Sequence, residues 1–139
     1  MTDLNTARNH LDSGNYTCVL CKGADVRFAT DRGVKPLLNW LDSGMNFRDF
    51  SAADRVVGRA TAFLYCLLGV RTVYAGVMSR PAAAVLEENG IEAHWGTLVD
   101  GIINRRGTGP CPFEAAVMDI RDSREALAAI RAKMAQMNN

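Results

Sequence analysis

A chain of 139 residues, 48% hydrophobic and 22% charged, has the size and composition of a globular domain with its own core. The formal net charge is only +1 and no basic block carries interleaved aromatic residues, so the sequence does not favour a nucleic-acid partner. No apolar run approaches the ~20 residues of a membrane-spanning helix, so we expect no membrane partner either.

The N-terminal residues and the cysteines bear on the cellular compartment that we expect for the protein. The first residues are polar and lack the apolar core of a signal peptide, so we expect the protein in the cytoplasm, where thiols stay reduced. Cys18 and Cys21 form a C-x-x-C pair, but no second pair completes a zinc knuckle. Residues three apart in a strand point to opposite faces. We therefore interpret both as small hydrophobic residues and expect no metal and no cofactor.

The first part of the chain predicts a helix, a β-hairpin and a second helix. Thr2 or Asp3 can cap a short helix that ends before the polar turn DSGN. Residues 16–30 predict two strands, since β-branched and aromatic residues flank a glycine turn. Pro36 then introduces an apolar helix that ends at Gly44.

The clearest predicted helix covers residues 51–69, SAADRVVGRATAFLYCLLG. Ser51 and Asp54 approximate a capping box at its start, with Asp in place of the usual Glu or Gln. Apolar residues recur at helical spacing after them, and Gly69 ends the pattern. So broad an apolar face predicts a helix that packs against a sheet.

The second half of the chain alternates strands and helices. Residues 71–79 form an apolar run of strand length, and Ser79 can cap the helix RPAAAVLEEN. The stretch IEAHW predicts another strand, and Thr97 can cap a short helix over residues 97–104. Further helices are predicted to begin at Pro112 and at Asp122. The order predicts one α/β layered domain over residues 1–139, with a mixed sheet.

Three stretches carry a family resemblance: ADRVVGRATAFLY, AGVMSRPAAAVLEENGI and NRRGTGPCPFEAAVMDI. The most specific part is the pattern N-R-x-G-x-G-x-C-P-x-E, from Asn104 to Glu114. Over nearly the whole chain, the sequence resembles an uncharacterised prokaryotic family, domain of unknown function 1893. The resemblance implies a cytidine-deaminase-like fold, a three-layer α/β/α domain with a central mixed sheet. The family has no established reaction, so the resemblance implies no activity.

The metal ligands of the zinc deaminases are missing. Those enzymes place a His or Cys ligand and a glutamate at the start of one helix, and P-C-x-x-C at the start of the next. The corresponding stretches here are S-A-A-D-R-V-V and S-R-P-A-A-A, and neither supplies a ligand. The sequence therefore argues against a conventional zinc deaminase.

A candidate site follows from the resemblance, which implies that two helix N-termini meet at the edge of the sheet. Helix starts attract anions and arginine binds phosphate, so we expect a nucleotide or another small phosphorylated ligand there. Asp54 suits a ribose hydroxyl, a base amine or proton transfer, although capping alone is the alternative for Asp54 and Ser79. The ligand-binding candidates are Arg55, Arg59, Ser79, Arg80, Asn104 and Arg105.

Cys111 is the best candidate for a reactive residue. It precedes a predicted helix and follows two arginines, which lower a thiol pKa, whereas Glu114 would raise it. One hypothesis is an enzyme that uses Cys111 as nucleophile or redox thiol, with Asp54 or Glu114 moving protons. The alternatives are that Cys111 caps the helix and Glu114 complements its dipole, or that Cys111 ligates a metal. A protein-interaction subunit or a homo-oligomer is a further possibility that the sequence leaves open.

Overall fold

The structure is a computed structural model that describes residues 2–104 and 106–137. In these residues, five strands form a mixed sheet in the order β2-β1-β3-β4-β5. The strands are β1 (Cys18–Lys22), β2 (Asp25–Ala29), β3 (Ser51–Val57), β4 (Thr72–Ser79) and β5 (Glu92–Val99). The helices are α1 (Asp3–Ser13), α2 (Lys35–Asp42), α3 (Arg59–Leu68), α4 (Arg80–Glu88), α5 (Pro112–Ala116) and α6 (Ser123–Met137).

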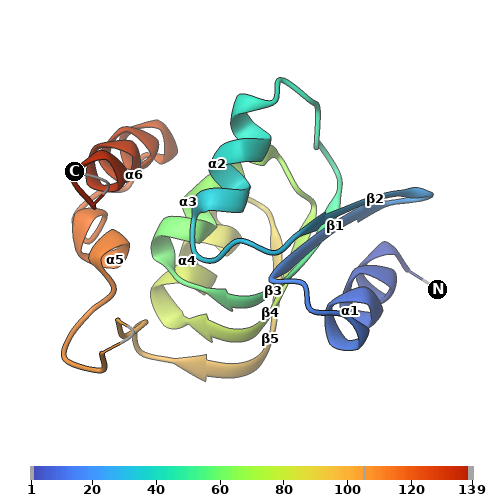
Figure 1. The fold of residues 1–139 in the computed structure, drawn as a ribbon, viewed down its shortest axis with the longest axis horizontal. Coiled ribbons are helices and arrows are strands. Elements are labelled where there is room, and N and C mark those ends of the chain that lie inside the picture. The colour runs from blue at the N-terminus through green and yellow to red at the C-terminus, as the bar shows by residue number, and fades with distance from the viewer. Residues whose placement is uncertain (1, 105, 138–139) are drawn as a thin grey trace.

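The sheet is antiparallel on one side and parallel on the other. β1 pairs antiparallel with both β2 and β3, while β3, β4 and β5 run parallel. Figure 1 shows α1 on one side of the sheet and α2, α3 and α4 on the other, with α5 and α6 beyond them. The predicted α/β fold with a mixed sheet is confirmed, and its arrangement agrees with three α/β/α layers.

Two cores of unequal size hold these layers together. The larger core lies between the sheet and helices α2, α3, α4 and α6, and the smaller one lies beneath α1. Cys18 belongs to the larger core and Cys21 to the smaller, so the predicted opposite orientation of the two thiols is confirmed. All four cysteines are free thiols.

The prediction of one helix over residues 51–69 is wrong in its first half. Ser51–Val57 is strand β3, which lies between β1 and β4, and α3 begins only after Gly58. Ser51 and Asp54 are buried within the sheet, so no capping box forms. Partners on both edges satisfy the backbone of this strand, and that pairing outweighs the local preference of the small residues for a helix.

The predicted short helix over residues 97–104 is also wrong. β5 continues through Thr97 to Val99, where it pairs in parallel with the last residues of β4. Two predicted helix caps are confirmed: Thr2 Oγ1 accepts the amide of Asn5 at 3.1 Å, and Ser79 Oγ accepts that of Ala82 at 3.1 Å. Within the described ranges, no helix combines the length and apolar character needed to cross a bilayer.

Candidate functional site

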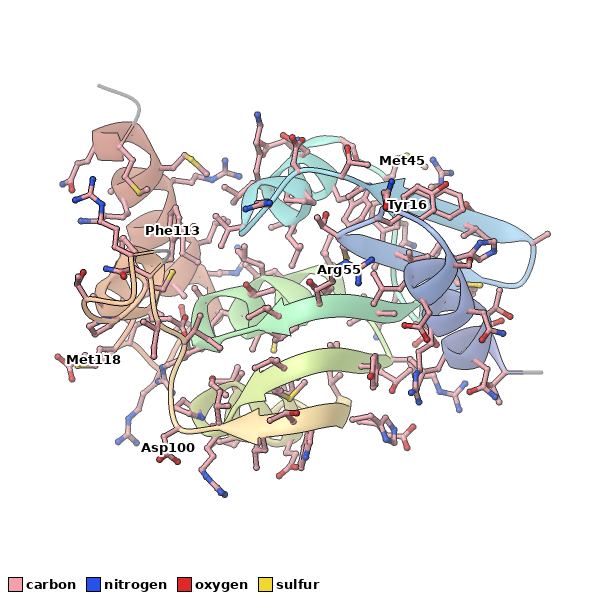
Figure 2. All side chains as sticks on the ribbon, turned by 60° about the horizontal axis from the view of Figure 1, so that its bottom comes forward. Tyr16, Met45, Arg55, Asp100, Phe113 and Met118 are labelled. Atoms are coloured by element: carbon pink, nitrogen blue, oxygen red, sulfur yellow. The ribbon has the colours of Figure 1, made fainter. Side chains whose placement is uncertain are left out.

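A cavity of about 630 Å³ opens where β3 ends and α3 begins. Its walls come from the start of β1, the loop between β2 and α2, the end of β3, the start of α3 and the segment around α5. Figure 2 shows Tyr16 and Arg55 on the side of α1 and Phe113 on the side of α5, and all three line the cavity. Residues far apart in the sequence therefore meet around this space.

Asp54 is the buried carboxyl of the cavity wall. It lies near the end of β3, and both Asp54 and the exposed Val56 line the cavity. Only 8% of Asp54 is exposed. Burial raises the pKa of its carboxyl from the ordinary 3.8 to about 6, although hydrogen bonds from Tyr65 and backbone amides oppose the shift. Such a carboxyl can exchange a proton near neutral pH.

Two buried groups stand behind Asp54. The Tyr65 hydroxyl donates to Asp54 Oδ2 at 2.7 Å and lies 2.9 Å from Cys18 Sγ. Burial raises the pKa of both Tyr65 and Cys18, and the nearby Asp54 charge raises them further. Both groups therefore remain protonated around neutral pH, and Cys18 is not an activated thiolate.

The side chain of Arg55 has a structural role at the C-terminal end of α1. Its Nε donates to the carbonyl of Tyr16 at 2.8 Å, and its Nη2 donates to those of Leu11 at 2.9 Å and Gly14 at 3.2 Å. The guanidinium thus satisfies the C-terminal end of α1 and the turn that follows it. These bonds occupy two of its nitrogens, so Arg55 is a weak candidate for ligand binding.

Glu114 caps α3 from 55 residues away. Its Oε1 accepts the amide of Arg59 at 2.7 Å, and its Oε2 accepts that of Ala60 at 2.8 Å. Gly58 makes room for this carboxylate, because a Cβ there would lie 2.6 Å from Glu114 Cδ. The N-terminus of α3 is therefore already occupied by an internal anion, contrary to the expectation that a ligand phosphate binds there.

Four further candidates lie outside the cavity lining. Arg59 donates its side-chain protons to the carbonyls of Val117 and Ile120. Ser79 is fully buried as the cap of α4, and exposed Arg80 pairs with Asp100 at 3.0 Å. The two helix starts that were expected to converge therefore do not share the cavity. Asn104 bonds with Thr108 inside its own loop. Arg105, the last candidate, lies outside the described residues.

Cys111 does line the cavity. It occupies the N-cap position of the five-residue helix α5, but its side chain makes no capping hydrogen bond. Its backbone amide donates to the Ile102 carbonyl at 2.9 Å, which anchors the segment. The predicted position at the helix start is confirmed, whereas the thiol itself does not cap. Within residues 2–104 and 106–137, no group of three or more His, Cys, Asp or Glu side chains is placed to hold a metal ion.

Comparisons with known proteins settle the family. The model of a domain of unknown function, DUF1893, matches residues 6–134. The chain belongs to the DUF1893 family. The crystal structure of a DUF1893 family protein from Thermotoga maritima is similar, with a TM-score of 0.84 at 22% identity, over 98% of this chain and 91% of that one. No curated protein matches. The family prediction is thus confirmed, while the likeness to cytidine deaminases stays a prediction.

The sequence analysis misses two residues of this DUF1893 cavity and one residue behind it. Tyr65, which bonds to Asp54 from the core, lies in a predicted apolar helix, where a tyrosine among Leu, Phe and Ala signals a buried hydroxyl that needs a partner. Arg32 lies in the exposed loop before α2, and Phe113 follows Pro112 in α5. Only the tertiary fold brings Arg32 and Phe113 to the same space, so no local pattern could have paired them.

The cysteines of this DUF1893 chain should differ in reactivity. Burial raises the pKa of Cys18, Cys21 and Cys66, that of Cys66 to about 11. Cys111 is half-buried in a cavity wall that reagents can reach. We expect iodoacetamide at pH 8 to label Cys111 first, as followed by peptide mass spectrometry. Faster labelling of Cys66 would contradict the arrangement, and Cys111 labelling faster than an unfolded-state thiol would support a nucleophilic role.

Proposed function

We propose that this DUF1893 protein binds a small nucleotide or nucleoside-like phosphorylated molecule in the cavity beside Asp54. The observation that carries the proposal is the buried carboxyl in the wall of a cavity of about 630 Å³. Ligand sites of ~300–1,000 Å³ are typical for molecules of this size, and they combine apolar walls with a few polar groups. A buried charge is costly for a fold, and a ligand that pairs with it explains its presence.

The lining suits a flat ring with polar substituents. Val34, Pro36 and Phe113 supply apolar surface, and Phe113 offers a ring on which a base can stack. Asp54 lies deepest among the charged side chains of the lining, with 8% of its surface exposed. A base amine or a ribose hydroxyl would donate to this carboxylate.

Arg32 is the best phosphate-binding group of the cavity. It is exposed at the cavity rim and forms no ion pair with any residue that the structure describes. However, Asp31 lies beside it, and the lining residues carry three carboxyls but, apart from Arg55, whose guanidinium is bonded to backbone carbonyls, only the one guanidinium of Arg32. A ligand with one phosphate fits this balance better than a triphosphate, whose charge would meet repulsion from the carboxyls.

Cys111 provides a second candidate function in the same cavity. Cys111 and Asp54 line the same cavity, so a ligand bound there lies close to a cysteine and a titratable carboxyl. Nucleophilic catalysis needs such a pair, and the alkylation experiment above tests whether the thiol is activated. The free thiols support a reducing compartment such as the cytoplasm for either function.

Equilibrium dialysis with labelled AMP, CMP and ATP tests the ligand class. We expect saturable binding of a monophosphate, weakened about tenfold or more by Asp54→Asn and by Arg32→Ala, since a bond to a charged group contributes about 1.5–3 kcal/mol. Asp12→Asn and Arg124→Ala are matched controls, because both residues are exposed and lie outside the cavity lining. Absence of saturable binding at millimolar concentration, or unchanged binding by Asp54→Asn, would refute the proposal.

A further inference from the structure

The two oxygens of Asp54 have different partners. Oδ2 accepts a short hydrogen bond from Tyr65 at 2.7 Å, whereas Oδ1 accepts a long one, at 3.4 Å, from the amide of Val56. Tyr65 is fully buried and does not belong to the cavity lining, but Asp54 does. The oxygen bonded to Tyr65 therefore points toward the core, which leaves Oδ1, with its longer hydrogen bond, as the oxygen for a ligand in the cavity.

The hydrogen bonds behind Asp54 have a defined direction. A phenol has one O–H, and Tyr65 uses it to donate to Asp54. The contact of 2.9 Å between Cys18 and Tyr65 must then be a donation from the thiol to the phenol oxygen. The hydrogen bonds therefore run from Cys18 to Tyr65 and from Tyr65 to Asp54. Each donor in this series supports the Asp54 carboxylate, which accepts at its end.

We propose that Tyr65 is a positioning residue that holds the Asp54 carboxylate with Oδ1 toward the cavity, so that the site selects a ligand presenting a hydrogen-bond donor at that point. This inference rests on the proposed function and specifies the recognition chemistry of the same cavity. An amino group on a heteroaromatic ring meets the requirement, because it donates in the plane of the ring. A ring that carries only a C–H there leaves the buried carboxylate without a partner and binds more weakly.

A titration of the free protein tests Tyr65 without any ligand. The Asp54 carboxyl is followed by ¹³C NMR in the wild type, in Tyr65→Phe and in Tyr74→Phe. Tyr74 is the matched control, because it packs in the other core beneath α1. The Tyr65 bond stabilises the ionised carboxyl, so Tyr65→Phe should raise the Asp54 pKa above the wild-type value of about 6, and Tyr74→Phe should not.

Apart from the Tyr65 hydroxyl, the groups that face Asp54 are the same in the wild type and in Tyr65→Phe. Cys18 approaches from β1 and Tyr65 from α3, while Arg55 is its neighbour in β3. The other charged groups of the cavity are Asp31, Arg32 and Glu114, and all of them are retained in Tyr65→Phe. An Asp54 pKa unchanged by Tyr65→Phe would overturn the positioning role, whether or not a nucleotide binds.

A pair of ligands tests the selection for a donor. AMP and purine riboside monophosphate differ only in the exocyclic amino group. We expect wild-type protein to bind AMP about tenfold more tightly or better, and Tyr65→Phe to reduce that preference. Equal affinity for the two ligands would overturn the proposal that the site selects a ligand with a hydrogen-bond donor. Failure of both to bind would count against the proposed function, while the titration would still decide the role of Tyr65.

Discussion

Asp54→Asn is expected to make the protein more stable at pH 7 than the wild type, by up to about 3 kcal/mol, while it weakens binding of the proposed ligand. The wild-type carboxyl titrates at about 6 in the fold, against an ordinary value of 3.8. A shift of one pKa unit corresponds to ~1.4 kcal/mol, so ionising this buried group is costly. Asparagine keeps the shape of the side chain and an oxygen that accepts from Tyr65, but it carries no charge.

The pH dependence has a definite sign. Below the unfolded pKa of 3.8 both states are protonated, and Asp54 imposes no penalty. As the pH rises toward the folded pKa of about 6, the unfolded chain loses its proton first, so the stability contributed by protonated Asp54 is lost. Above this window the penalty stays constant. The free energy of unfolding of Asp54→Asn should lack this fall.

Urea unfolding at several pH values between 4 and 7 measures both effects. The difference in unfolding free energy between Asp54→Asn and the wild type should grow with pH and then level off. Asp12→Asn, which changes an exposed carboxyl, should follow the wild type. A variant that is less stable than the wild type at pH 7 would show that Asp54 serves the fold rather than a ligand, since residues kept at a cost in stability are typical of binding sites.

Gly58→Ala should destabilise the protein through its collision with Glu114. The backbone at Gly58 has φ −98° and ψ −177°, which alanine adopts freely, so the cost comes from the added methyl group. Glu114→Ala removes two hydrogen bonds from a carboxylate to the first amides of α3. Each single variant should lose about 2 kcal/mol, which lowers the melting temperature of a domain of this size by several degrees.

The double variant, Gly58→Ala with Glu114→Ala, tests whether the two losses of stability come from the same contact. Once Glu114 is absent, the methyl group at position 58 meets no carboxylate, so Gly58→Ala should cost little or stabilise slightly. The effects should therefore be less than additive by about 1–2 kcal/mol in urea unfolding. Gly101→Ala is a matched control, because a Cβ there has no neighbour within 4 Å. Strict additivity would mean that Glu114 does not occupy the space over Gly58.

The elements with local signals were predictable from the sequence. The caps at Thr2 and Ser79 satisfy nearby amides, and the glycine turn of the hairpin lies between two short strands. The segment of β3 predicts a helix start from its sequence alone, because Ser51 and Asp54 match a capping pattern and the small residues between them have no strand periodicity. Residues 51–57 form a strand because they pair with β1 and β4 at once, and these partner strands lie outside the segment.

Several residues of the candidate site could be predicted from the sequence, but their arrangement in space could not. The sequence predicts Asp54, Glu114 and Cys111 as site residues, and all three line the cavity. Their relationships differ from the prediction, since Asp54 lies in a strand and Glu114 caps a helix distant in the chain. Local charge patterns identify such residues, but the partners of each one depend on contacts made across the fold.

A thermal-shift screen of wild type and Asp54→Asn against nucleosides, nucleotides and sugar phosphates tests the cavity most directly. A ligand at ~100 times its dissociation constant stabilises a fold by about 2.7 kcal/mol, which raises the melting temperature by several degrees. We expect such a rise for a monophosphorylated ligand with the wild type and little or none with Asp54→Asn, each relative to its own baseline. No rise with any compound, or equal rises in both proteins, would contradict a ligand site at Asp54.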